Sequence, residues 1–147
     1  MHAPDLTQRP PRSPRVRLGG YVLLPRILDK CRATLAGKNG EYNFNCPLDR
    51  RFFEFVQLDA EAFKKQVEYG SGDGEMVAWV AEHSRVKPRV PEILAWSAYE
   101  EQRVSGDLEM REFFHGLHQK AAPNRTDIQT WFDLLDVDDY VSFGGKA

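Results

Sequence analysis

Apolar residues recur along much of this chain at the spacing of helices. One stripe follows steps of three and four residues and consists of Leu24, Leu28, Cys31 and Leu35. Such spacing places its members on one helical face, with the charged residues between them on the others. Pro25 suits a first helical turn, and Gly37 suits the left-handed position just beyond a helix end. The pattern therefore predicts a helix between these two residues.

Further helical patterns follow, each with a residue that favours a helix start. Pro47 and Pro91 suit first turns, and Thr126 with Gln129 three residues later has the form of a capping box. Three carboxylates can cap free amide groups at the start of other helices: Asp59, Asp73 and Asp107. We therefore predict an all-α fold, a compact bundle of about six or seven short helices with an extended N-terminal arm.

Only one short stretch has the alternation of a strand. After the turn dipeptide Asn39-Gly40, the residues EYNFN alternate polar with aromatic side chains, which would bury Tyr42 and Phe44. No second strand-like run lies nearby, so we expect an isolated extended segment rather than a sheet.

The N-terminus differs in charge from the remainder. Residues 1–18 hold four arginines and one aspartate, a net charge of +3, whereas residues 19–147 carry −5. With its prolines, the segment 1–20 is predicted to be an extended basic arm packed on a single helical domain, residues 21–147. The arginines, Arg9, Arg12, Arg15 and Arg17, could bind phosphates of a nucleic acid or lie along the acidic domain. Nucleic acid is the less favoured partner, because the domain would repel its backbone and carries no recognised motif.

Composition places the chain among soluble proteins. Its 147 residues suffice for one domain with its own core, and no apolar run approaches the length of a membrane span. The N-terminus lacks the pattern of a secretory signal, and two cysteines are too few for a disulfide framework. We therefore expect a cytoplasmic protein with no membrane partner.

Cys46 lies where a helix begins and has two interpretations. The positive end of a helix, with Arg50 and Arg51 nearby, favours a reactive thiolate. However, Asp49 in the same turn competes for that field, and no histidine is close in sequence. We favour a structural cysteine beside an Asn45 cap, with a catalytic nucleophile as the alternative.

A second candidate group is Glu112, His115 and His118, whose spacing of three brings successive side chains to nearby parts of a helix. These residue types could bind a metal or act as acid and base. A di-iron bundle would need a second such motif, and a zinc site would need further ligands that the sequence does not place. We expect surface or capping histidines, with no metal and no cofactor.

The acidic run from Asp133 to Asp139 lacks the pattern of a calcium loop, because Tyr140 and Val141 occupy positions that require an oxygen ligand and a glycine. It suits a solvated helix end. A second interpretation is that these carboxylates bind arginines of the arm, from the same chain or a neighbouring one.

Three segments carry a resemblance to a known family: RPPRSPRVRLGGY, GEYNFNCPLD and APNRTDIQTWFDLLDVDDYVSFGG. Together they resemble an uncharacterised family of small bacterial proteins, a domain of unknown function. The resemblance implies a bacterial, stand-alone, compact helical protein whose arm is part of the domain. It implies no reaction and no catalytic residue.

Because no catalytic motif assembles, the favoured function is a small non-enzymatic binding or interaction module, with a protein or a second copy as partner. The alternatives are an enzyme that uses Cys46 or the Glu112, His115 and His118 group, and nucleic-acid binding through the arm. The predicted binding residues are the arm arginines together with Tyr42 and Trp96. A convergent pocket would favour the enzyme, whereas an exposed patch would favour the module.

Overall fold

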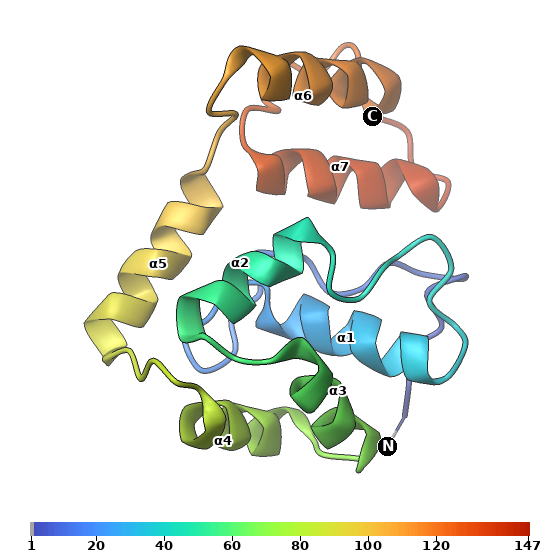
Figure 1. The fold of residues 1–147 in the computed structure, drawn as a ribbon. Helices are drawn as coiled ribbons and strands as arrows, with labels where there is room; N and C mark the ends of the chain where they lie inside the picture. The colour runs from blue at the N-terminus through green and yellow to red at the C-terminus, as the bar shows by residue number, and fades with distance from the viewer. Residues whose placement is uncertain (1) are drawn as a thin grey trace.

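The fold is all-α, as the hydrophobic pattern predicts. The computed structural model describes residues 2–147, and within this range it contains seven helices and no strand (Figure 1). The helices are α1 (Leu24–Leu35), α2 (Pro47–Val56), α3 (Ala60–Glu68), α4 (Asp73–His83), α5 (Val90–Gln102), α6 (Leu108–Ala121) and α7 (Trp131–Ser142). Within that same range, no helix combines the length and the apolar character needed to cross a membrane.

The main core surrounds α1. The apolar face of α1 is fully buried and consists of Leu24, Ile27, Leu28 and Cys31. These residues belong to one apolar cluster with residues of α2 and α3 and with Phe132 of α7. Aromatic rings fill the space between α2, α3 and α5. Trp96 of α5 stacks on Phe55 of α2, with ring centroids 5.0 Å apart. Figure 1 shows α5 along one side of the molecule, joining α4 to the pair formed by α6 and α7.

A second, smaller apolar cluster joins α6 to α7. It contains Ala122, Ile128, Leu134 and Val137, with Phe114 of α6 packed against it. No residue of α6 is itself buried. Helix α7 therefore lies between the main core and α6, which forms the outer edge of the molecule (Figure 1).

The arm has no regular secondary structure and lies on the helices. Leu6 is buried and donates its backbone N–H to the carbonyl of Lys38, while Leu23 donates to the carbonyl of Pro14. Gly40 has a φ of 53°, and a Cβ at this position would lie 2.9 Å from the carbonyl oxygen of Leu6. Glycine is thus required where the arm crosses the 39–46 loop.

Two of the predicted helix caps are confirmed. The Asp59 carboxylate accepts from Glu61 and Ala62 at the start of α3, and Asp107 accepts from Met110 at the start of α6. The prediction for Asp73 is wrong by one position, because Gly72 is the N-cap of α4. The carboxylate of Asp73 instead accepts from two arginines, Arg12 and Arg32.

The predicted capping box at Thr126 is also wrong. Helix α7 begins at Trp131, where Thr130 Oγ1 accepts from the N–H of Asp133 and the Asp133 carboxylate accepts from the N–H of Thr130. This box also has a threonine followed by a polar residue three positions later. It starts the helix in the register that buries Phe132 and Leu134, which explains why it is used.

Ser97 provides a test of how α5 is held to the start of α1. Its fully buried Oγ donates to the Gly20 carbonyl at 2.7 Å and accepts from the Val22 N–H at 3.1 Å. Ser97→Ala leaves both backbone groups unpaired, so we expect it to lower the free energy of unfolding by about 2 kcal/mol. Urea unfolding measures this change. The matched control Ser105→Ala should alter stability by less than about 0.5 kcal/mol, and an equally small effect of Ser97→Ala would contradict the assignment.

Candidate functional site

A pocket of about 550 Å³ lies where the arm, the 39–46 loop, α1 and α7 meet. Its walls are largely apolar and include Leu6, Leu48, Leu135 and Phe143. Its polar lining comes from the arm, α1, the loop and α7, and consists of Arg26, Lys30, Glu41, Tyr42, Asn43, Cys46 and Asp138, with the hydroxyl residues Thr7 and Ser142. Volume and lining are those of a small-molecule site, a concave apolar space with a few convergent polar groups.

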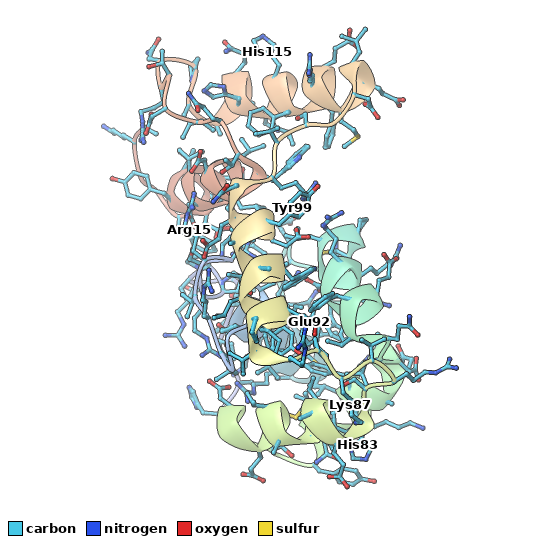
Figure 2. All side chains as sticks on the ribbon, turned by 90° about the vertical axis from the view of Figure 1, so that its left-hand side faces the viewer. Arg15, His83, Lys87, Glu92, Tyr99 and His115 are labelled. Atoms are coloured by element: carbon cyan, nitrogen blue, oxygen red, sulfur yellow. The ribbon has the colours of Figure 1, made fainter. Side chains whose placement is uncertain are left out.

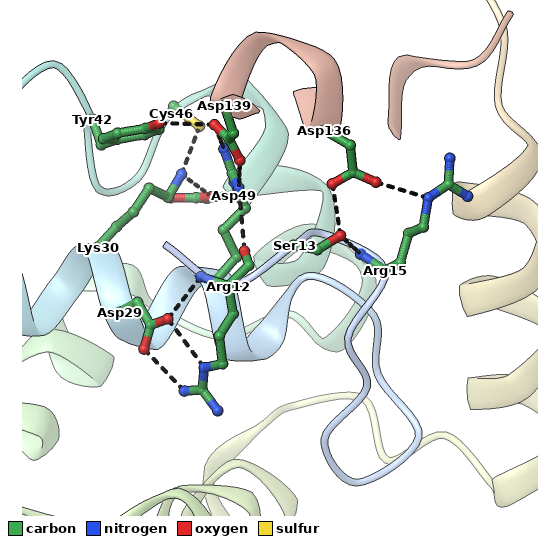
Figure 3. A network of polar contacts seen from close by, with 11 residues as sticks. Arg12, Ser13, Arg15, Asp29, Lys30, Tyr42, Cys46, Asp49, Asp136 and Asp139 are labelled. Atoms are coloured by element: carbon green, nitrogen blue, oxygen red, sulfur yellow. Dashed lines mark hydrogen bonds and ion pairs between the residues drawn. The ribbon is translucent and has the colours of Figure 1, made fainter. Parts of the chain in front are cut away.

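Lys30 lies between a carboxylate and a thiol. Its Nζ donates to Asp49 Oδ1 at 2.7 Å and to Cys46 Sγ at 3.4 Å (Figure 3). The side chains of Lys30 and Asp49 are 4% and 0% exposed, so this ion pair is shielded from water. A buried ammonium requires such a partner, because desolvation of an unpaired charge costs several kcal/mol. The pair places a cation against the sulfur of Cys46.

Arg26 forms the second buried ion pair of the pocket. Its guanidinium donates two bonds to Asp139, at 2.8 and 3.2 Å, and the Tyr42 hydroxyl donates to the same carboxylate at 2.8 Å. The guanidinium also lies over the Tyr42 ring, 5.5 Å from its centroid. Burial, with the bond to Asp139, raises the pKa of Tyr42. Its hydroxyl therefore remains a neutral donor that orients the carboxylate.

The charges of the pocket do not cancel. Arg26 and Lys30 are each neutralised by a buried carboxylate, which leaves the lining residues Glu41 and Asp138 as excess negative charge. Within the described residues, Asp138 has no side-chain hydrogen bond and no ion pair at contact distance. Partial desolvation, together with the adjoining Asp139 carboxylate, raises the pKa of Asp138, against the opposing effect of Arg26 and Lys120. The pocket thus offers an exposed carboxylate with no ion-pair partner at contact distance, although Arg26 and Lys120 lie near enough to act on it.

Cys46 occupies the N-cap position of α2, but its side chain makes no capping hydrogen bond. The expectation of an Asn45 cap is wrong. Asn45 has a φ of 59° and lies one position before the cap, and its backbone N–H donates to Asp49 Oδ2 at 2.9 Å. Asp49 satisfies the helix start from within the first turn while it also binds Lys30. The thiol of Cys46 is therefore available to the pocket.

Three of the four arm arginines bind carboxylates of their own chain. Arg12 binds Asp29 and Asp73, Arg17 binds Glu101, and Arg9 is exposed. Arg15 binds two carboxylates of the acidic run on α7, Asp133 and Asp136. Figure 3 shows the contact with Asp136, to which Ser13 also donates. These are the intramolecular contacts that the opposite charges of arm and domain allow.

The structure does not bring Glu112, His115 and His118 together as a site. Glu112 and His115 are exposed on α6, and Figure 2 shows His115 at the outer side of that helix. His118 Nε2 donates to the Arg125 carbonyl at 2.6 Å, which ties α6 to the following loop. In residues 2–147 no three histidine, cysteine, aspartate or glutamate side chains are grouped as metal ligands.

Of the other two predicted binding residues, Tyr42 lines the pocket, whereas Trp96 packs between Tyr21, Phe52 and Phe55. Sequence reasoning missed Arg26, Lys30 and Asp138. The available signal was the spacing of four residues between Arg26 and Lys30, which puts both cations on one face of the predicted helix, beside its apolar stripe. Nothing local indicated that this face is buried.

Asp138 makes a pH dependence testable. A carboxyl whose pKa is higher in the folded than in the unfolded protein contributes stability below the unfolded pKa, near 3.8, and this contribution is lost as pH rises through the folded pKa. Asp138→Asn removes the ionisation, so its melting temperature should exceed that of the wild type at pH 7. The difference should shrink as pH falls towards 3.8. Thermal unfolding across pH measures it, and a lower melting temperature at pH 7 would contradict the assignment.

Comparison with known proteins places the chain in a family. A family model described as a domain of unknown function (DUF5069) matches residues 8–141, which include most of the arm and nearly all of α7. A comparison with curated proteins gave no match. The resemblance to a domain of unknown function is confirmed at the level of the family. Because the match spans most of its length, the chain belongs to the DUF5069 family.

Proposed function

We propose that the protein is a binding module for a small organic cation, an amine with an apolar body, and that the ligand binds in the pocket beside Asp138. The observation that carries the proposal is a carboxylate with no ion-pair partner at contact distance, in a pocket whose own cations are already paired. A ligand ammonium would supply the missing charge. The apolar walls would cover the body of the ligand.

An anionic ligand is a poorer match for the same reason. At Lys30 or Arg26 it would meet a cation whose charge a buried carboxylate, Asp49 or Asp139, already neutralises. It would also face Asp138 and Glu41 at the pocket lining. Charge complementarity therefore favours the cation.

The proposal includes the setting that the sequence suggested, a bacterial and cytoplasmic protein. Nucleic-acid binding through the arm has less support, because Arg12, Arg15 and Arg17 already bind carboxylates. Phosphates would have to compete with these pairs for the same guanidinium groups.

Three probes of similar size and different charge test the pocket: 2-phenylethylamine, 2-phenylethanol and 3-phenylpropanoate. Chemical shift perturbation in titrations of the full chain measures affinity and location. We expect the amine to bind most tightly, with shifts around Tyr42 and Leu135, and Asp138→Asn to weaken it by about tenfold. The matched control Glu82→Gln, an exposed carboxylate on α4, should leave the affinity unchanged. Tighter binding of the anion, or equal binding of all three probes, would contradict the proposal.

A second candidate function is an enzyme with Cys46 as nucleophile. The specific observation in its favour is the contact of Lys30 Nζ with Cys46 Sγ at 3.4 Å, inside a pocket of substrate size. A cation at this position stabilises an anionic sulfur and assists attack on an electrophile. Asp138 in the same lining could exchange a proton with a bound substrate.

Alkylation rates test this candidate. In the native protein, iodoacetamide should modify Cys46 and spare Cys31, since Cys31 is fully buried and burial raises the pKa of its thiol to about 12. If Cys46 is a catalytic nucleophile, iodoacetamide should modify it faster than it modifies N-acetylcysteine at the same pH. The labelling should be lost in the variant Cys46→Ser. A rate equal to or below that of the free thiol would leave Cys46 with its structural role at the start of α2.

A further inference from the structure

Helix α6 exposes an apolar stripe that its own chain covers only in part. Met110, Phe113 and Leu117 follow one another at spacings of three and four, and their side chains are 39%, 57% and 38% exposed. Such spacing forms a continuous ridge along one side of a helix. Large apolar side chains that gather on an exposed helix mark an interaction surface more often than isolated ones do.

This stripe adjoins the contact with α7, because the Phe113 ring lies 6.3 Å from the Trp131 ring of α7, centroid to centroid. The α7 side of α6 is formed by Phe114 and Ala121, which pack on the smaller apolar cluster. With 3.6 residues per turn, Phe113 lies about 100° from Phe114 around the helix axis. One side of this apolar arc packs on α7, whereas the other side, at Phe113, stays 57% exposed.

Gly116 lies inside α6, within a turn of Phe113, and nothing in the monomer accounts for it. A Cβ at this position would meet no atom within 4 Å, so no neighbour in this chain requires the absence of a side chain. Glycine in a helix interior also weakens the helix relative to alanine. A close approach from outside the chain would explain the residue, since glycine leaves a notch in the helix surface that can receive a bulky group.

Two opposite charges lie on the same side of α6 as this notch. Counting about 100° per residue, Glu109, Gly116 and Lys120 all fall within about 60° of Phe113, on the side away from Met110 and Leu117. Glu109 is near the N-terminal end and Lys120 near the C-terminal end, and both are exposed. The order along this edge is acid, aromatic, notch and base.

We propose that α6 binds α6 of a second copy of this chain, antiparallel about a twofold axis. In the register that brings Glu109 level with Lys120 of the partner copy, Phe113 comes level with Gly116 of the partner copy, because both pairs are symmetric about the same point of the helix. One register therefore forms both charge pairs and places both rings over both notches. The Met110 and Leu117 side chains flank these contacts.

A second copy fits this surface better than an unrelated partner. A twofold interface is formed by the same patch on both copies, so it must be complementary to itself. Opposite charges at the two ends of a helix, with an aromatic ring and a notch between them, satisfy that condition when the helix is reversed. No residue of α6 lines the pocket, although Lys120 lies near enough to Asp138 to lower its pKa. The dimer is therefore tested by sedimentation, which does not depend on ligand binding in the pocket.

Sedimentation equilibrium of the full chain over a range of concentrations tests the proposal. The wild type should be a concentration-dependent dimer. Glu109→Lys and Lys120→Glu should each weaken the dimer by about tenfold, because two symmetry-related attractions become repulsions. The double variant Glu109→Lys with Lys120→Glu should restore the wild-type affinity, since the pairs are again opposite in sign.

Gly116→Leu fills the notch and should abolish the dimer, while circular dichroism of the variant stays helical because the site is open in the monomer. Glu82→Lys on α4 is the matched control and should leave the dimer unchanged. A wild type that remains monomeric at all concentrations overturns the proposal, and so does a dimer that tolerates both Gly116→Leu and the single charge reversals.

Discussion

Two buried charges, Arg26 of α1 and Asp139 of α7, bind each other across 113 residues of chain. Removing them from water costs several kcal/mol for each ion, so the pair persists only because its geometry is good. Two guanidinium bonds and the Tyr42 hydroxyl converge on one carboxylate. This contact fixes α7 against α1. Together with the Lys30–Asp49 pair it also forms the polar lining of the pocket and leaves Asp138 as the carboxylate without a close partner.

The arm serves as an internal ligand of the helices. Arg12 links α1 to α4 through Asp29 and Asp73, and Arg15 links the arm to the start of α7. The hydrogen bonds from Arg12, and then those from Arg32, lower the pKa of Asp73 despite its partial burial. A segment that by composition could bind phosphates thus neutralises the acidic body of its own chain. Leu6, at the start of the arm, also supplies part of the pocket wall.

The helices were predictable because their signals are local. The apolar stripe of α1, the aspartate caps of α3 and α6 and the prolines at the starts of α2 and α5 each act within one or two turns. The start of α7 was not predictable, since Thr126 and Thr130 both precede suitable partners. The choice between them depends on whether Phe132 and Leu134 reach their cores, which is a tertiary property.

The sequence by itself determined the all-α class, the position of most helices and the opposite charges of arm and domain, because periodicity and composition act over short distances. The tertiary structure alone decided which charges are buried. Lys30 and Arg26 appear at ordinary polar positions of an amphipathic helix, yet their partners lie 19 and 113 residues away. Hydrophobic spacing contains no information about such distant pairs. The pocket, with the exposed Asp138 in its lining, and the partly open side of α6 arise only when the helices pack.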